Sequence, residues 1–114
     1  MTNHSNFLLF SSSISHDDVV NSAGDDLGHV EDLMIDPVTG KVDYAVLSFG
    51  GFLGIGDKYF AVPFDQFSVD RENKRMVLNV DKDRLKDAPG FDKDDWPDFS
   101  DERFRTRVSD FYHA

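Results

Sequence analysis

The sequence predicts a small all-β protein, a six-stranded antiparallel barrel with one helical turn after its last strand and a helical tail at the C-terminus. The chain of 114 residues holds short runs of β-branched, aromatic and aliphatic residues, separated by turn residues. Residues 42–67 show the order strand, glycine-rich loop, strand and proline corner. No long helical pattern separates the strands before residue 81, which is typical of a small antiparallel barrel.

The first two strands are expected in the N-terminal third of the chain. Residues 1–17 are interpreted as a partly disordered lead-in, a strand follows over residues 18–21, and a turn covers residues 22–25. The second strand is expected over residues 27–36, but its apolar positions lose strict alternation in the middle. One extra residue restores the register, so we predict a β-bulge around Glu31–Asp32.

The central pair of strands follows a hairpin turn at residues 36–40, where Pro37 presets φ and Gly40 allows a left-handed exit. The strands over residues 42–49 and 59–62 are apolar on both faces. A strand with one face in water alternates polar and apolar residues, so both faces of this pair are expected to be covered. Some other segment or molecule must therefore lie over the outer face.

The remaining elements follow the proline corner, because Pro63 cannot donate a hydrogen bond to the sheet and ends the strand. Strands are expected over residues 67–70 and 75–80, and Asp81 is expected to cap one helical turn. Residues 91–114 are expected to form an acidic linker and a helix capped by Ser100. Four apolar residues of that helix share one face, namely Phe104, Val108, Phe111 and Tyr112.

Composition excludes several classes of function. Twenty-two acidic against 12 basic residues give a net charge of −10, which disfavours binding to nucleic acid or to an anionic membrane surface. No apolar run is long enough to insert into a membrane, and no basic region precedes residues 7–10 as in a signal peptide. The absence of cysteine fits a cytoplasmic location.

The residues resemble the PRC-barrel domain family over about residues 18–90. The matching segments are Val19-Val20-Asn21, Gly24, Leu27-Gly28-His29-Val30-Glu31-Asp32, Asp36-x-x-x-Gly40, Tyr44-Ala45-Val46-Leu47, Gly50-Gly51-Phe52-Leu53-Gly54-Ile55-Gly56, Val62-Pro63-Phe64 and Leu85-Lys86-Asp87-Ala88-Pro89. The tail with Trp96-Pro97 resembles extensions of stand-alone, single-domain members. This divides the chain into a lead-in over residues 1–17, a PRC-barrel domain over residues 18–90 and a tail over residues 91–114.

The resemblance implies a six-stranded barrel that docks on other proteins and has no chemistry of its own. The family includes the cytoplasmic part of the photosynthetic reaction-centre H subunit and the C-terminal domain of a ribosome-maturation factor. The sequence holds neither the membrane helix of the first nor the RNA-associated first domain of the second. Neither specific role is therefore expected of this chain.

Two motifs approach known ligand sites and then depart from them. The run from Gly51 to Lys58 resembles a phosphate-binding loop, but Asp57 stands where that loop needs lysine and a strand follows. Residues 92–98 resemble a calcium loop, but Trp96 and Pro97 stand where an oxygen ligand and a glycine are required. No histidine pair has a helical ligand spacing, and no serine has an assignable base. We therefore expect no enzyme activity, no cofactor, and no catalytic or metal site.

The leading hypothesis is a protein–protein interaction module without enzymatic activity, whose partner is unknown and which self-associates as a homodimer. The predicted interaction surface combines the loop, the outer sheet face and the tail: Phe52, Leu53, Ile55, Tyr44, Tyr59, Trp96, Phe104, Val108, Phe111 and Tyr112. The alternative is a small-molecule or metal-ion-binding sensor domain. The sequence leaves open whether the tail packs on its own barrel or on a second chain.

Overall fold

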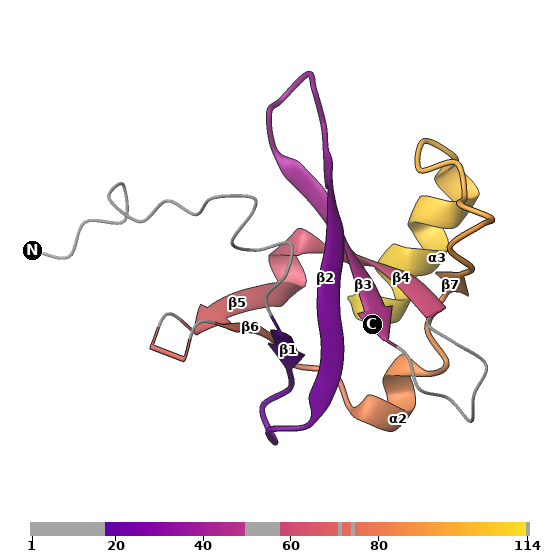
Figure 1. The fold of residues 1–114 in the computed structure, drawn as a ribbon. Coiled ribbons are helices and arrows are strands. Elements are labelled where there is room, and N and C mark those ends of the chain that lie inside the picture. Colours follow the sequence, from indigo (N-terminus) through magenta and orange to yellow (C-terminus); the bar gives the residue numbers. More distant parts are fainter. Residues whose placement is uncertain (1–17, 50–57, 71, 74, 114) are drawn as a thin grey trace, which may run out of the picture.

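A computed structural model describes residues 18–49, 58–70, 72–73 and 75–113 of the chain. The described residues form one mixed β-sheet and two α-helices (Figure 1). The elements are, in chain order, β1 (Asp18–Val20), β2 (Asp26–Ile35), β3 (Val42–Phe49), β4 (Lys58–Pro63), the 3₁₀ turn η2 (Phe64–Gln66), β5 (Phe67–Asp70), β6 (Arg75–Leu78), α2 (Lys82–Leu85), β7 (Gly90–Phe91) and α3 (Glu102–Tyr112).

The seven strands lie in the order β5-β6-β1-β2-β3-β4-β7, which corrects two details of the predicted fold. An additional strand, β7, pairs with β4, and β1 runs parallel to β6 with Val19 opposite Met76. Hairpin turns force the consecutive strands to be antiparallel, but β1 and β6 are far apart in sequence and no turn sets their direction. The described strands do not close, since β5 and β7 stand at the two ends of the sheet.

The predicted bulge and hairpin turn are both confirmed. Val30 pairs with Leu47 and Asp32 pairs with Val46, so Glu31 is the extra residue on β2. At the turn, the Asp36 side chain accepts a hydrogen bond of 2.8 Å from the Val38 amide, and the Gly40 amide donates one of 2.8 Å to the Asp36 carbonyl. Gly40 has a φ of 75°, the left-handed conformation that the pattern required.

At Gly28 the backbone of β3 leaves no room for a side chain on β2. Its φ is 102°, and a Cβ atom placed there would lie 1.9 Å from the carbonyl oxygen of Ser48 on β3. That position is occupied by backbone, which cannot move aside as a flexible side chain would. Only glycine therefore fits at this point of β2.

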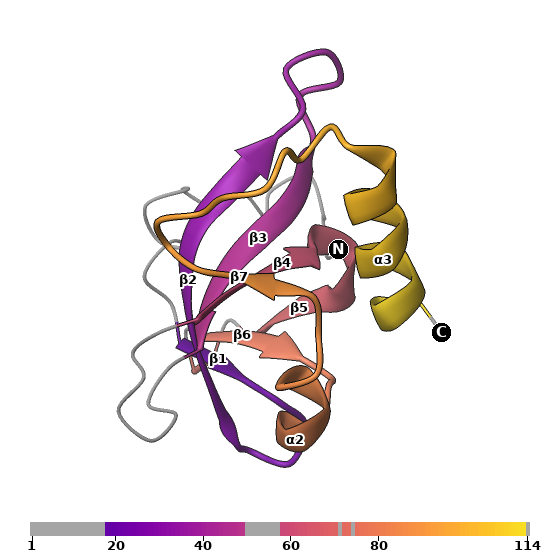
Figure 2. The ribbon, with the colours of Figure 1, turned by 90° about the vertical axis from the view of Figure 1, so that its right-hand side faces the viewer.

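Both faces of the central strands are covered, as the apolar pattern indicated. Ala45, Val46 and Leu47 of β3 are fully buried, and so are Ala61 and Val62 of β4. α3 packs against β4, and Figure 2 shows α3 running beside the sheet with the linker crossing in front of it. The chain's own tail is thus the cover of the outer face.

Candidate functional site

An aromatic cluster joins the sheet to the tail. We use this name for Tyr44, Tyr59, Phe91, Trp96, Phe99 and Phe104. Phe99 stands at its centre, with ring centroids 6.0 Å from those of Tyr44 and Phe91 and 5.4 Å from that of Phe104. Trp96 lies 5.7 Å from Tyr59 and 5.1 Å from Phe91, and its indole nitrogen donates a 2.7 Å hydrogen bond to the Lys93 carbonyl. Aromatic contacts at these separations stabilise the packing of one segment on another.

The aromatic cluster brings together four residues that the sequence assigned to an interaction surface: Tyr44, Tyr59, Trp96 and Phe104. They meet inside one chain, and Tyr44 and Phe104 are each only 8 % exposed. Trp96 is the member that keeps a large exposed area, at 41 %. Phe52, Leu53 and Ile55 lie outside the described residues.

The apolar stripe of α3 faces inward. Val108 is fully buried and Tyr112 is 9 % exposed, while Phe111 is half-buried at the edge. The guanidinium of Arg84 on α2 lies over the Phe111 ring, 4.8 Å from its centroid, and donates a 2.8 Å hydrogen bond to the Phe111 carbonyl. This clamp holds the end of α3 against α2.

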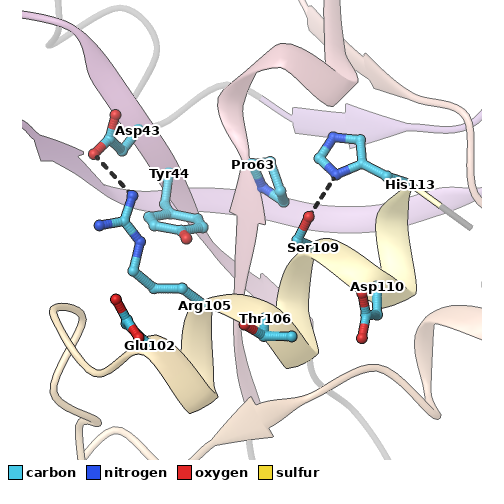
Figure 3. A pocket seen from close by; sticks show the side chains of 9 residues that line it. All are labelled: Asp43, Tyr44, Pro63, Glu102, Arg105, Thr106, Ser109, Asp110 and His113. Atoms are coloured by element: carbon cyan, nitrogen blue, oxygen red, sulfur yellow. Dashed lines mark hydrogen bonds and ion pairs between the residues drawn. The ribbon is translucent and has the colours of Figure 1, made fainter.

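A groove of about 530 Å³ runs between α3 and the ends of β3 and β4; Figure 3 labels the nine residues that line it. Arg105 spans the groove to Asp43, with 3.9 Å between guanidinium nitrogen and carboxylate oxygen. A hydrogen bond to the Tyr44 hydroxyl is the main cause that raises the pKa of Arg105 above its ordinary value, helped by the charge of Asp43. Arg105 therefore stays charged and ties α3 to β3.

At the far end of this groove, Ser109 and His113 of its lining form a row with Asp65 of η2. The Ser109 hydroxyl lies 3.1 Å from His113 Nδ1, and His113 Nε2 lies 3.4 Å from Asp65. A nucleophilic triad needs its aspartate buried, so that it orients the histidine away from water. Here the Asp65 side chain is 73 % exposed and that of His113 is 41 % exposed, so the arrangement lacks this feature of a triad and links the end of α3 to η2. Sequence reasoning missed it, although Ser109 and His113 have the four-residue spacing of one helix face.

A second groove, of about 750 Å³, lies between α2, the start of β4, β7 and α3. Lys58, Arg84 and Arg107 line it together with Asp87 and Asp110. No local sequence pattern indicates this groove, because the three cations come from three separate elements.

The acidic linker uses its carboxylates locally. Asp98 accepts hydrogen bonds from the Ser100 hydroxyl at 2.6 Å and the Ser100 amide at 2.9 Å, which hold the pKa of Asp98 below its ordinary value. Within the described residues, no group of three or more His, Asp or Glu side chains is placed to hold a metal ion. In the same part of the chain, no helix is both long and apolar enough to cross a membrane.

Comparison with known proteins agrees with the resemblance read from the motifs. The family model described as PRC-barrel domain matches residues 8–85, more than half of the chain. Among curated proteins, no sequence matches this chain. The matched range includes β1 to β6 and α2, and it leaves β7 and α3 outside. The chain belongs to the PRC-barrel domain family.

Proposed function

We propose that this chain is a protein–protein interaction module without enzymatic activity and that it self-associates as a dimer through the β2–β3 hairpin. The observation that supports this most directly is the exposure of two aliphatic side chains on that hairpin. Ile35 is 57 % exposed and Val38 is 91 % exposed. The docking role that the family resemblance implies points the same way. Closure of the sheet into a barrel and a cytoplasmic location are parts of the same proposal.

The hairpin is shaped to reach a neighbour. Figure 1 shows the turn between β2 and β3 projecting beyond the rest of the sheet. Single exposed apolar residues are common on protein surfaces and need no partner. Two of them on one projecting element form a patch that a second copy can cover without any rearrangement of the core.

The tail already covers the outer sheet face, and we therefore place the dimer contact on this hairpin. Tyr44 and Val108 are buried within one chain, so they offer no surface to a second copy while the tail is in place. The loop residues Phe52 and Leu53, predicted from the sequence to contact a partner, remain a second candidate surface. The two surfaces are separate in sequence and can be tested apart.

The test is the mass of the chain in solution by size-exclusion chromatography with light scattering, as a function of protein concentration. We expect a dimer whose dissociation constant rises by about tenfold or more in Ile35→Ser/Val38→Ser, because burial of each aliphatic side chain contributes roughly 1.5–3 kcal/mol. Lys41→Gln, on the same hairpin, is the control and should leave the dimer unchanged. Because each copy has a net charge of −10, added salt should strengthen the dimer.

Three outcomes distinguish the possibilities. A monodisperse monomer at all concentrations would contradict self-association altogether. A dimer that is insensitive to the hairpin pair but lost in Phe52→Ser/Leu53→Ser would keep the function and move the surface to the loop. A dimer insensitive to both pairs would refute both surfaces.

A further inference from the structure

The second groove gathers positive charge on a strongly acidic protein. Its three cations, Lys58, Arg84 and Arg107, make no ion pair with any described carboxylate. Four other cations, Arg75, Lys86, Arg103 and Arg105, do have such a partner. The whole chain is negative, with 22 acidic and 12 basic residues. The three cations of the groove therefore create a local positive field in a negatively charged protein.

The groove is preorganised by the packing around it. Arg84 is fixed by its hydrogen bond of 2.8 Å to the Phe111 carbonyl and by its position over the Phe111 ring. The lining includes Gly90, where an added Cβ atom would lie 2.9 Å from the Phe60 ring and 3.1 Å from Lys58 Cε. The absence of a side chain at Gly90 thus leaves room for the Lys58 stem beside the groove. A guanidinium held in place loses less freedom when it binds a ligand than a mobile one does.

The charges lining the groove favour one kind of anion. Three cations and the carboxylates of Asp87 and Asp110 leave a formal charge of +1. The two carboxylates of the lining repel a ligand with several negative charges, whereas a single carboxylate group is neutralised by the surplus cation. The planar fork of a guanidinium matches the two oxygens of a carboxylate.

We propose that this groove binds a carboxylate group, supplied by a small carboxylic acid or by an acidic side chain of a protein chain. Arg84 fixes one side of the group, and Lys58 and Arg107 neutralise it. Because Arg107 lies on α3 while Lys58 and Arg84 belong to β4 and α2, an occupied groove ties the tail to the sheet. This site is independent of the hairpin and of self-association.

The experiment follows backbone amide signals by NMR while acetate, or an acetylated and amidated Gly-Glu-Gly peptide, is added to the full chain at constant ionic strength. We expect saturable shifts centred on Gly90 and the α3 residues around Arg107. Arg107→Gln should weaken binding by about tenfold, the loss of one charge-assisted contact. Arg107 makes no described polar contact, so this variant should keep the native spectrum.

The control is Arg103→Gln, which removes the same charge from the same helix outside the groove and should leave binding unchanged. Tighter binding of the peptide than of acetate assigns the group to a protein side chain, and equal binding assigns it to a small acid. The proposal is overturned by shifts that do not saturate, by equal affinities of the Arg107→Gln and Arg103→Gln variants, or by tighter binding of inorganic phosphate.

Discussion

The hydroxyl group of Tyr112 is buried on the inner side of α3 without a hydrogen-bond partner among the described residues. A buried hydroxyl that loses water and gains no partner costs roughly 1–3 kcal/mol. Burial also raises the pKa of Tyr112 above its ordinary value of 10.0, because the phenolate would lose its hydration. One atom therefore lowers stability at neutral pH and makes stability depend on pH in alkaline solution.

We expect Tyr112→Phe to preserve or increase the free energy of unfolding at pH 7, because the ring stays packed and the unsatisfied hydroxyl is removed. In the wild type, the unfolded chain releases the Tyr112 proton near pH 10 while the folded chain retains it. The free energy of unfolding therefore falls as pH rises above that value, by at most about 1.4 kcal/mol per pH unit from this residue. Urea denaturation at pH 7 and at several pH values above 10 measures both effects.

Tyr44→Phe is the matched variant, because the Tyr44 hydroxyl is bonded to Arg105. Its removal should lower the free energy of unfolding at pH 7 by about 1 kcal/mol. A loss of the same size in Tyr112→Phe would show that the Tyr112 hydroxyl has a partner after all.

At the scale of elements, α3 shows which features follow from local sequence. Its apolar stripe was predicted from spacing alone, and three of the four residues, Phe104, Val108 and Tyr112, are buried, while the fourth, Phe111, is half-buried. The predicted cap was wrong: Asp101 accepts the hydrogen bond from the Arg103 amide, and the helix begins at Glu102. Serine and aspartate are equally good caps. The choice depends on Asp98, which engages the Ser100 hydroxyl and so removes it from the helix.

We therefore expect Asp101→Ala to lower helix content and the denaturation midpoint more than Ser100→Ala does. The hydrogen bond from the Arg103 amide is also the main cause that holds the pKa of Asp101 below its ordinary value. The stabilisation by this cap is therefore fully present above the pKa that Asp101 has in the unfolded chain. It is lost as the pH falls through the lower pKa that Asp101 has in the folded chain. Circular dichroism of both variants between neutral and acid pH checks this. A larger effect of Ser100→Ala would show that Ser100 caps the helix, as predicted from the sequence.

The sheet shows the same division between local and long-range information. The bulge at Glu31 and the turn at residues 36–40 were predictable, because hydrophobic alternation and turn type depend on residues that are close together in the sequence. The parallel pairing of β1 with β6 was not, since it joins segments that no turn connects. The need for glycine at position 28 depends on the Ser48 carbonyl of another strand, which no local pattern reveals.

At the scale of the whole molecule, the main question is what covers the outer sheet face. The apolar pattern of β3 and β4 predicted a cover, and the stripe of α3 predicted an element in need of a surface. Their match within one chain also depends on the linker, whose Trp96 and Phe99 fill the aromatic cluster between them. The two grooves could not be predicted, because each collects side chains from elements that meet only after this packing.

We expect the tail to be a removable cover that a single charge on its inner side detaches. Val108 is fully buried in α3, so Val108→Asp places a carboxylate where it can be hydrated only if the helix leaves the sheet. We expect α3 to lose helicity, Tyr44 and its neighbours to become exposed, and the chain to bind an apolar fluorescent dye and to associate. Thr106→Asp adds the same charge on the exposed side of the same helix and should leave dye binding and mass unchanged.

If Val108→Asp unfolds the sheet as well, the amides of β2 and β3 will lose their protection from hydrogen exchange. In that case the tail is an integral part of the domain core. Retained protection of these amides together with dye binding would show that it is a cover, and that its release exposes the surface first predicted for docking.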